Sequence, residues 1–136
     1  MKKLLSTAYT NTGFNLATFM LRVVLAFNMC YSHGLAKIKN FSEWQHDFYD
    51  PLHIGHKSSL IVTIFLEAFV SLFLLLGIFS RIAALLLLLE MCVVVFMYQK
   101  GQPLIRYENA ILFLGGFLCI LLVGPGRLSV DGMTGK

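Results

Sequence analysis

Four long apolar stretches, separated by short polar or glycine-rich breaks, dominate this chain. A helix rises 1.5 Å per residue, so about 20 apolar residues span roughly 30 Å, the thickness of a bilayer's hydrocarbon core. Backbone polar groups must bond internally in lipid, and no alternating pattern indicates a strand. The sequence predicts an all-α integral membrane protein, a four-helix bundle with spans at about residues 16–35, 60–79, 82–98 and 107–123.

The breaks between these stretches predict how the helices are joined. Almost nothing separates the second stretch from the third, so we expect a tight antiparallel hairpin around Ser80 and Arg81. Gly101 and Pro103 break the chain before the fourth helix, and the glycines and proline at 124–126 end it. Four crossings place both termini on one side of the membrane.

A longer polar segment, at about residues 37–59, joins the first two helices. It mixes charged groups with Phe41, Trp44, Phe48 and Tyr49, which favours a surface helix or lid at the headgroup level over a disordered linker. A metal site could be imagined from its histidines and acids, but their spacing is not diagnostic, so we predict none. The residues concerned are His46, Asp47, Asp50, His53 and His56.

Composition supports the membrane assignment. The 136 residues are 57% hydrophobic and only 13% charged, about half the charged fraction of a soluble domain, and we treat them as one domain. The net charge of +4 comes from scattered Lys and Arg, which predicts lipid headgroups rather than nucleic acid as the partner. Lysines and arginines divide equally between the two sides, and Lys2 and Lys3 incline us to cytoplasmic termini.

The three cysteines suggest no redox motif. Cys30, Cys92 and Cys119 each lie in an apolar stretch without a second cysteine nearby, so we expect structural filling rather than thiol chemistry.

Three charged residues lie inside the predicted spans, where a lone charge costs about 2.5 to 3.5 kcal/mol. From the side of the termini, the helical rise places Arg22 about 9 Å deep, Glu90 about 12 Å and Glu67 about 18 Å. We expect Arg22 to face Glu67 and Glu90. The surplus negative charge then requires a protonated carboxyl, or a proton, cation or polar ligand in a cavity. The alternative is a structural Arg22–Glu67 pair, with Glu90 neutral or reaching the headgroups.

A second polar cluster is expected at the opposite face. His33 and Lys37 lie one turn apart at the end of the first helix, and Arg106 and Glu108 begin the fourth. They would act either as an interfacial anchor or as a ligand gate.

Several motifs together resemble the DoxX family of small four-helix bacterial membrane proteins. Arg22 followed by His33-Gly34-Leu35-Ala36-Lys37 resembles the family's R…HGxxK pattern, and Glu67 followed by Leu76-Gly77 and Arg81 resembles E…LGxxxR. The ending Gly124-Pro125-Gly126-Arg127-Leu128-Ser129-Val130-Asp131 resembles GPGxxSxD. Gln99 and Gln102 stand where relatives often carry His and Asp, which argues against proton transfer at that turn.

The resemblance implies a plasma-membrane protein and several different functions. Some relatives are associated with thiosulfate:quinone oxidoreductase, one with a membrane complex handling thiol stress, and more distant ones with membrane-protein assembly. It therefore implies a subunit of a quinone- or thiol-linked oxidoreductase, with quinone as the only cofactor suggested and soluble or membrane redox proteins as partners. The alternatives are a non-catalytic assembly factor or amphiphile binder, and a proton-coupled carrier, which would need a homo-oligomer.

Overall fold

The computed structural model describes residue 8 and residues 10–135, and every regular element in that part of the chain is helical. A first continuous run contains α1 (Asn11–Asn28), the π-helical η1 (Met29–Gly34) and α2 (Leu35–Lys39). After α3 (Phe41–Trp44), a second run contains α4 (His56–Ile64), the π-helical η2 (Phe65–Val70) and α5 (Ser71–Leu76). The remaining elements are α6 (Ser80–Val93), the π-helical η3 (Val94–Tyr98), the 3-10 turn η4 (Leu104–Arg106), α7 (Glu108–Val123) and α8 (Val130–Met133).

Three of the helical runs are long and apolar enough to cross a membrane. They are Asn11–Lys39, His56–Leu76 and Ser80–Tyr98. The fourth apolar helix, α7, has 16 residues, or about 24 Å of helix. The first run is 29 residues long and extends past both ends of the predicted apolar span, so it includes Lys37, which was expected at the end of this helix.

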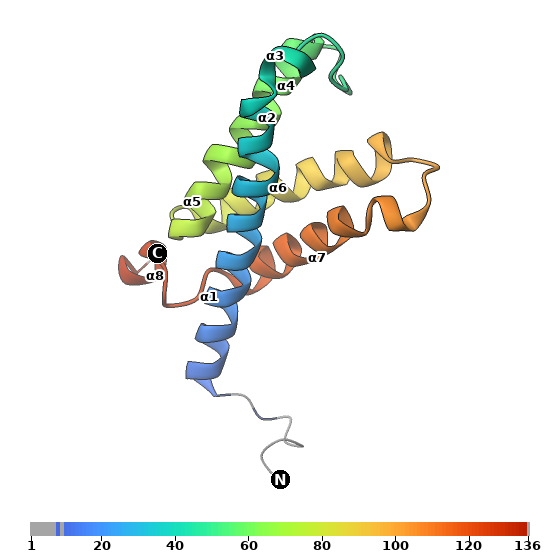
Figure 1. Ribbon diagram of the computed structural model, residues 1–136. Coiled ribbons are helices and arrows are strands. Elements are labelled where there is room, and N and C mark those ends of the chain that lie inside the picture. Colours follow the sequence, from blue (N-terminus) through green and yellow to red (C-terminus); the bar gives the residue numbers. More distant parts are fainter. Residues whose placement is uncertain (1–7, 9, 136) are drawn as a thin grey trace.

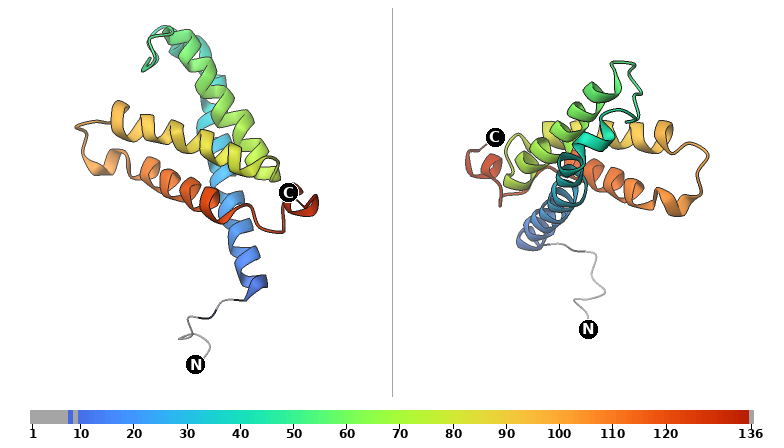
Figure 2. Two further views of the ribbon diagram at one scale, coloured as in Figure 1. Left: turned by 180° about the vertical axis from the view of Figure 1, so that it is seen from behind. Right: turned by 45° about the horizontal axis from the view of Figure 1, so that its top comes forward.

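The helices form two antiparallel pairs that cross one another. Figure 1 shows the run from α1 to α2 beside α4 and α5, while α6 with η3 lies beside α7. The two views of Figure 2 show the same crossing, with the outer ends of the pairs diverging instead of remaining in one regular bundle. The apolar core lies around the crossing, with Ala26, Met29, Leu74, Leu87 and Phe117 buried.

Small residues permit close contact at the crossing. Ala83 and Ala84 of α6 are buried, and their small side chains let neighbouring helices approach closely. In α7, a side chain at Gly116 would begin 2.3 Å from Leu25 of α1, whereas Gly115 has open space. Only one of the two adjacent glycines is therefore needed for helix packing.

The outward faces of the helices are strongly apolar. Phe27, Phe65, Phe96 and Leu122 are each more than half exposed in the isolated chain. Apolar faces of this extent are typical of helices surrounded by lipid.

The turn between α5 and α6 confirms the predicted tight hairpin. Only residues 77–79 separate the two helices, and Gly77 ends α5 in the left-handed conformation with φ of 76°. Phe79 adopts a positive φ of 48° immediately before α6. This turn brings the end of one helix directly to the start of the next.

The segment between α2 and α4 is held by side-chain contacts. Asp50 accepts hydrogen bonds from the Ile54 and Gly55 backbone amides and from the Ser59 hydroxyl, at 3.1, 2.7 and 2.6 Å. Tyr49 packs on Tyr98 of η3, with ring centroids 5.0 Å apart. Among the described residues, no group of three His, Cys, Asp or Glu side chains is placed to hold a metal ion.

Candidate functional site

An ion pair links the first two membrane-spanning runs in the interior. Lys37 Nζ of α2 donates to both carboxylate oxygens of Glu67 in η2, at 2.8 Å to Oε1 and 2.6 Å to Oε2. The side chains are 14% and 5% exposed, so the pair is largely shielded from the surroundings. A charge that has a bonded partner of opposite sign avoids most of the penalty of burial in an apolar medium.

Gly34 allows the two helices to approach closely enough for this pair. A Cβ at Gly34 would lie 2.8 Å from the Ala68 backbone nitrogen and 2.9 Å from the Glu67 carbonyl carbon. Both contacts involve backbone, which cannot move aside as a flexible side chain can. Gly34 is therefore required where η1 packs against η2.

In the π-helical segments at this contact, backbone carbonyls accept hydrogen bonds from side chains. The carbonyl of Ala68 in η2 accepts from the Cys30 thiol at 3.6 Å and from the Ser71 hydroxyl at 3.1 Å. Ser71 also donates to the carbonyl of Glu67. Single-turn π segments often occur at functional sites. Cys30 thus has a specific hydrogen-bonding role in addition to filling space.

Glu90 of α6 reaches the same interior from the second helix pair. It interacts electrostatically with Glu67 and with Lys37. Both of its carboxyl oxygens are buried, and neither has a hydrogen-bond partner among the described residues. The ionic interior, defined here as Lys37, Glu67 and Glu90, thus contains two acids and one base.

Arg22 does not join this group, contrary to the expectation that it would face Glu67 and Glu90. It lies beside Gly77, where an added Cβ would be 1.9 Å from Arg22 Nη1. Glu67 precedes Gly77 by ten residues, or about 15 Å of helix. The expected contact rested on estimated depths and on side-chain reach, whereas the structure places Arg22 beside Gly77 and Glu67 beside Lys37.

Arg22 instead holds the C-terminal segment. It is 1% exposed, and Nη2 donates to the carbonyl of Leu128 at 2.6 Å. Its guanidinium lies over the Phe19 ring, 5.6 Å from the centroid, and interacts electrostatically with Asp131. Apart from Gly77, the partners of Arg22 therefore come from its own helix and from residues more than a hundred positions away.

Residues 124–134 form a structural unit that we call the C-terminal latch. The Asp131 carboxylate accepts from the backbone amides of Phe79 and Ser80, at 3.0 and 2.7 Å, and from the Ser80 hydroxyl at 2.8 Å. The Asp131 amide donates to the carbonyl of Gly77 at 2.9 Å. A carboxylate at this position satisfies free amides at the start of α6 and complements the helix dipole.

The latch also reaches the beginning of α1. The Arg127 amide donates to Asn15 Oδ1 at 2.9 Å, and a Cβ at Gly126 would lie 2.3 Å from Thr18 Oγ1. Ser129 is buried and accepts from the Gly132 amide at the start of α8. Gly124 has a positive φ of 90° and lies near the exposed Arg81, whose Nη2 would be 3.5 Å from an added Cβ. Pro125 is partly buried beside them.

Of the second expected cluster, the structure shows an interaction between His33 and Lys37. His33 lies within electrostatic range of Lys37, but Lys37 turns to Glu67. Arg106 and Glu108 are exposed, and among residues 10–135 no ion pair joins them to His33 or Lys37. The four-residue interfacial cluster stays a prediction, of which the structure shows the electrostatic interaction between His33 and Lys37.

A polar pocket lies between the first run and α7, and we call it the His33 pocket. It has a volume of about 280 Å³ and combines amide, hydroxyl and imidazole groups with apolar side chains. The ring of His33 meets that of Phe113 edge-on, with centroids 5.5 Å apart. The residues that line it are Leu25, Asn28, Ser32, His33, Asn109, Leu112 and Phe113.

A scan against protein-family models matches DoxX over residues 17–100. This region includes Arg22, His33, Lys37, Glu67 and Glu90. The chain belongs to the DoxX family. Searches of curated proteins and of solved structures returned no match.

In this DoxX protein, the matched region contains the complete ionic interior but ends before the latch. The resemblance of residues 124–131 to a family signature therefore has a structural explanation that is independent of the match: Gly126, Ser129 and Asp131 make the close contacts of the latch.

Sequence reasoning missed three features of the DoxX site. It did not pair Lys37 with Glu67, although the spacing of His33 and Lys37 placed both on one helix face. It gave no role to Asn28, Ser32 and Asn109, which are uncharged and therefore were not conspicuous within apolar stretches. It also gave no indication of the π segments, because a single π turn within an almost uniformly apolar stretch leaves no distinct pattern in the sequence.

Proposed function

We propose that this DoxX protein is a membrane subunit of a quinone- or thiol-linked oxidoreductase and that it binds a quinone ring in the His33 pocket. The observation that carries the proposal is the composition of that pocket. Asn109 and Ser32 can donate hydrogen bonds to a ring carbonyl, and Phe113 offers an aromatic surface. Ligand pockets commonly combine an apolar lining with a few polar groups of this kind.

The neighbourhood of the pocket suits the proton demand of the reaction. A quinone that becomes a quinol accepts two electrons and two protons. A dithiol that becomes a disulfide releases two electrons and two protons. His33 lines the pocket and lies within electrostatic range of Lys37, which is bonded to Glu67. Imidazole can accept or donate a proton near neutral pH, so His33 is the residue we assign to proton transfer at the ring. Electrons come from a thiol or sulfur donor held by a partner protein.

The proposal includes four membrane crossings with both termini on one side. α7 begins after η4, beyond the end of η3, and leads to the latch, which is bonded to the first residues of α6. The shorter α7 thus runs antiparallel to α6 and η3, a run that is itself long enough to cross the membrane. By family resemblance the membrane is the bacterial plasma membrane, and we place the termini on its cytoplasmic side.

Photoaffinity labelling would test the quinone site. The purified protein in lipid nanodiscs is illuminated with a short-chain azidoquinone, and labelled peptides are mapped by mass spectrometry. We expect labelling in η1 and the first turns of α7, reduced by unlabelled quinone and by Asn109→Leu. His33→Gln should slow quinol formation from a dithiol in membranes containing the partner, whereas His46→Gln, a change in the exposed loop, should not.

Labelling spread over all lipid-facing helices, or unaffected by competing quinone, would contradict a quinone site in this pocket. Equal rates of quinol formation for His33→Gln, His46→Gln and the unmodified protein would contradict the role given to His33.

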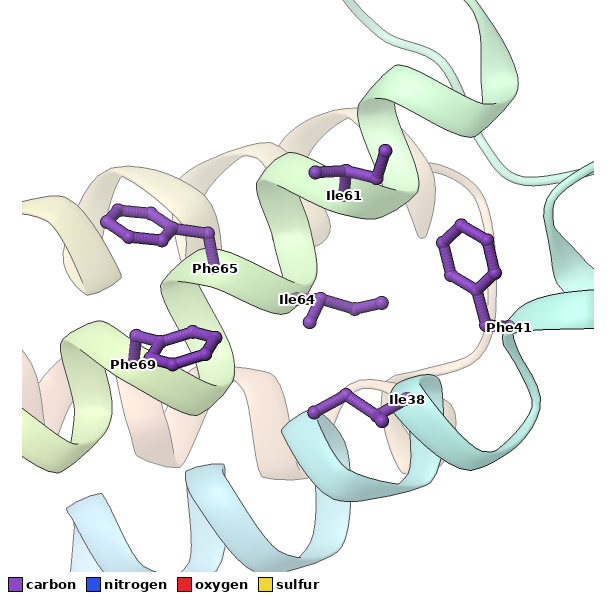
Figure 3. Close-up of a pocket in the computed structure, with 6 residues that line it drawn as sticks. All are labelled: Ile38, Phe41, Ile61, Ile64, Phe65 and Phe69. Atoms are coloured by element: carbon purple, nitrogen blue, oxygen red, sulfur yellow. The ribbon is translucent and has the colours of Figure 1, made fainter.

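A second candidate function, binding of an amphiphile during membrane-protein assembly, is supported by a different cavity. Figure 3 shows a groove between α2–α3 and α4–η2. The volume of this groove is about 330 Å³. All of its lining side chains are apolar: Ile38, Phe41, Ile61, Ile64, Phe65 and Phe69. If an acyl chain is retained there, native mass spectrometry should detect a lipid that Ile64→Trp removes and that Leu122→Trp, on an exposed face of α7, leaves in place. If both variants retain the lipid, amphiphile binding in this groove is contradicted.

A further inference from the structure

We propose that Glu90 carries a proton when the protein is at rest, so that the ionic interior is a single-proton binding site. Both carboxyl oxygens of Glu90 on α6 are buried, and the residue lies within electrostatic range of the Lys37–Glu67 pair. This proposal does not depend on a quinone in the His33 pocket, and it assigns a chemical state to a residue that the proposed function leaves without a role.

The charge balance of the interior supports this assignment. Lys37 neutralises Glu67, with both Glu67 oxygens engaged by the single ammonium group. A charged Glu90 would add a second carboxylate without a counter-charge, with both of its oxygens buried and within electrostatic range of the first. An isolated buried carboxylate is so unfavourable that the group usually becomes neutral instead.

Within the part of the chain that the structure describes, no other charge acts on Glu90 to balance it. The groups that act on it are Glu67 of η2 and Lys37 of α2. On α7, which is packed along α6, the ionisable side chains are Cys119 and Glu108, and both are exposed. His33 of η1 is in range of Lys37 and, when protonated, would be repelled by it. Residues 71–76 of α5 contain no ionisable side chain.

A proton fits the site better than a metal cation. Both Glu90 oxygens are buried without a hydrogen-bond partner among the described residues, and the Glu67 oxygens are taken by Lys37. Hard cations require about six oxygen ligands, and among residues 10–135 no group of three acidic, histidine or cysteine side chains is placed to supply them. An unbonded neutral carboxyl costs far less free energy than an unbonded charge.

A protonated carboxyl within the hydrocarbon region has a characteristic reactivity. A hydrophobic carbodiimide takes up the carboxyl proton, and the carboxylate oxygen adds to its central carbon, which gives an O-acylisourea without loss of any group. The acyl group then migrates to nitrogen and forms a stable N-acylurea. A charged carboxylate cannot supply the proton that this addition needs.

The test uses dicyclohexylcarbodiimide on the full-length protein in nanodiscs, followed by peptide mass spectrometry. We expect labelling at Glu90, decreasing as the pH is raised, and complete loss of this label in Glu90→Gln. Glu108, exposed at the start of α7, serves as the matched carboxyl within the same protein. The water-soluble carbodiimide EDC should favour Glu108 instead. If Glu90 reacts no faster than Glu108 with the hydrophobic reagent, the proposal is overturned.

Stability provides a second readout that does not depend on labelling. Gln imitates a neutral carboxylic acid, so Glu90→Gln should leave the thermal midpoint unchanged, whereas Glu67→Gln should lower it by leaving Lys37 unpaired. In the unmodified protein, an infrared carbonyl band of a protonated carboxyl should disappear on alkaline titration. The absence of that band at neutral pH, or a large drop in the midpoint for Glu90→Gln alone, would show that Glu90 is charged.

Discussion

Arg22 and Lys37 lie on one continuous helical run, and they bond to different parts of the molecule. Arg22 bonds to Leu128 in the C-terminal latch, whereas Lys37 bonds to Glu67 in the ionic interior. Fifteen residues, or roughly 22 Å of helix, separate the two bases. The pattern of charges in the sequence correctly marked both residues as unusual, but the choice of partner depended on helix ends that were misplaced by several residues.

Replacement of Arg22 should weaken the latch without affecting the ionic interior. Arg22→Gln removes the charged donor to the Leu128 carbonyl, and a hydrogen bond of this kind contributes about 2 kcal/mol. We expect a comparable loss of unfolding free energy in detergent titration. Arg106→Gln, at an exposed site, is the control and should change little. Equal effects from the two variants would contradict a structural role for Arg22.

The loop residue Asp50 should make the start of α4 sensitive to acid. The Ser59 hydroxyl, together with the Gly55 and Ile54 amides, holds the pKa of Asp50 below its ordinary value. Because the folded-state pKa is lowered, the stabilisation is present above the unfolded pKa and is lost as the pH falls through the folded one. We expect the Gly55 amide resonance in NMR to shift only below pH of about 3.9, the ordinary Asp value. Asp50→Asn should abolish the shift, and a midpoint at or above the ordinary value would contradict the assignment.

At the scale of the elements, the sequence predicted which segments are helical better than where they end. Three predicted spans correspond to runs that are long enough to cross, and the fourth corresponds to α7 within one residue at its start. The first run extends from residue 11 to residue 39, beyond both predicted ends, because polar residues such as Asn11 and Lys37 continue the helix outside its apolar centre. Apolar periodicity marks only that centre.

The contacts between elements could not be read from local pattern. Asp131 accepts from the first turn of α6, about fifty residues earlier in the chain, and no local signal connects these positions. The glycines and proline at 124–126 predicted only a helix end. Their actual role is to bring the chain back against Thr18 and Gly77, which depends on the three-dimensional arrangement.

The contact between the α5–α6 turn and the latch should be intolerant of a single methyl group. Gly77→Ala places a Cβ 2.5 Å from the Ser129 side chain and closer still to Arg22, at a φ of 76°. Strain at such a residue alone is about 1 to 3 kcal/mol, so we expect at least that loss in unfolding free energy. Gly115→Ala, in α7 with open space, should be neutral or stabilising. A Gly77→Ala protein as stable as Gly115→Ala would contradict the close packing.

At the scale of the whole molecule, the two crossing helix pairs leave large apolar faces outside and bury charged side chains in two places, the ionic interior and Arg22 beside the latch. The sequence predicted the apolar exterior and the presence of internal charge. It did not predict that the pairs diverge at their outer ends, because hydropathy carries no information about crossing angles (Figure 1). A homo-oligomer stays a prediction. The exposed apolar faces of the helices would accommodate its interface.

Site-directed cysteine accessibility should verify the proposed topology. In a background without native cysteines, Lys57→Cys and Lys100→Cys should react with an impermeant maleimide from one side of oriented vesicles. Arg127→Cys should react from the other side, since the latch lies against the beginning of α1. Reaction of Lys100→Cys and Arg127→Cys from the same side would show that α7 does not cross.

The central claim is that the internal charges of this DoxX protein form two separate centres, with Glu67 paired to Lys37 rather than to Arg22. Double-mutant cycles measured by unfolding in lipid nanodiscs or bicelles test it most directly. Lys37→Met with Glu67→Gln should show a coupling energy of about 1 kcal/mol or more, and Arg22→Gln with Glu67→Gln should show almost none. Strong coupling of Glu67 to Arg22, with none to Lys37, would contradict the account.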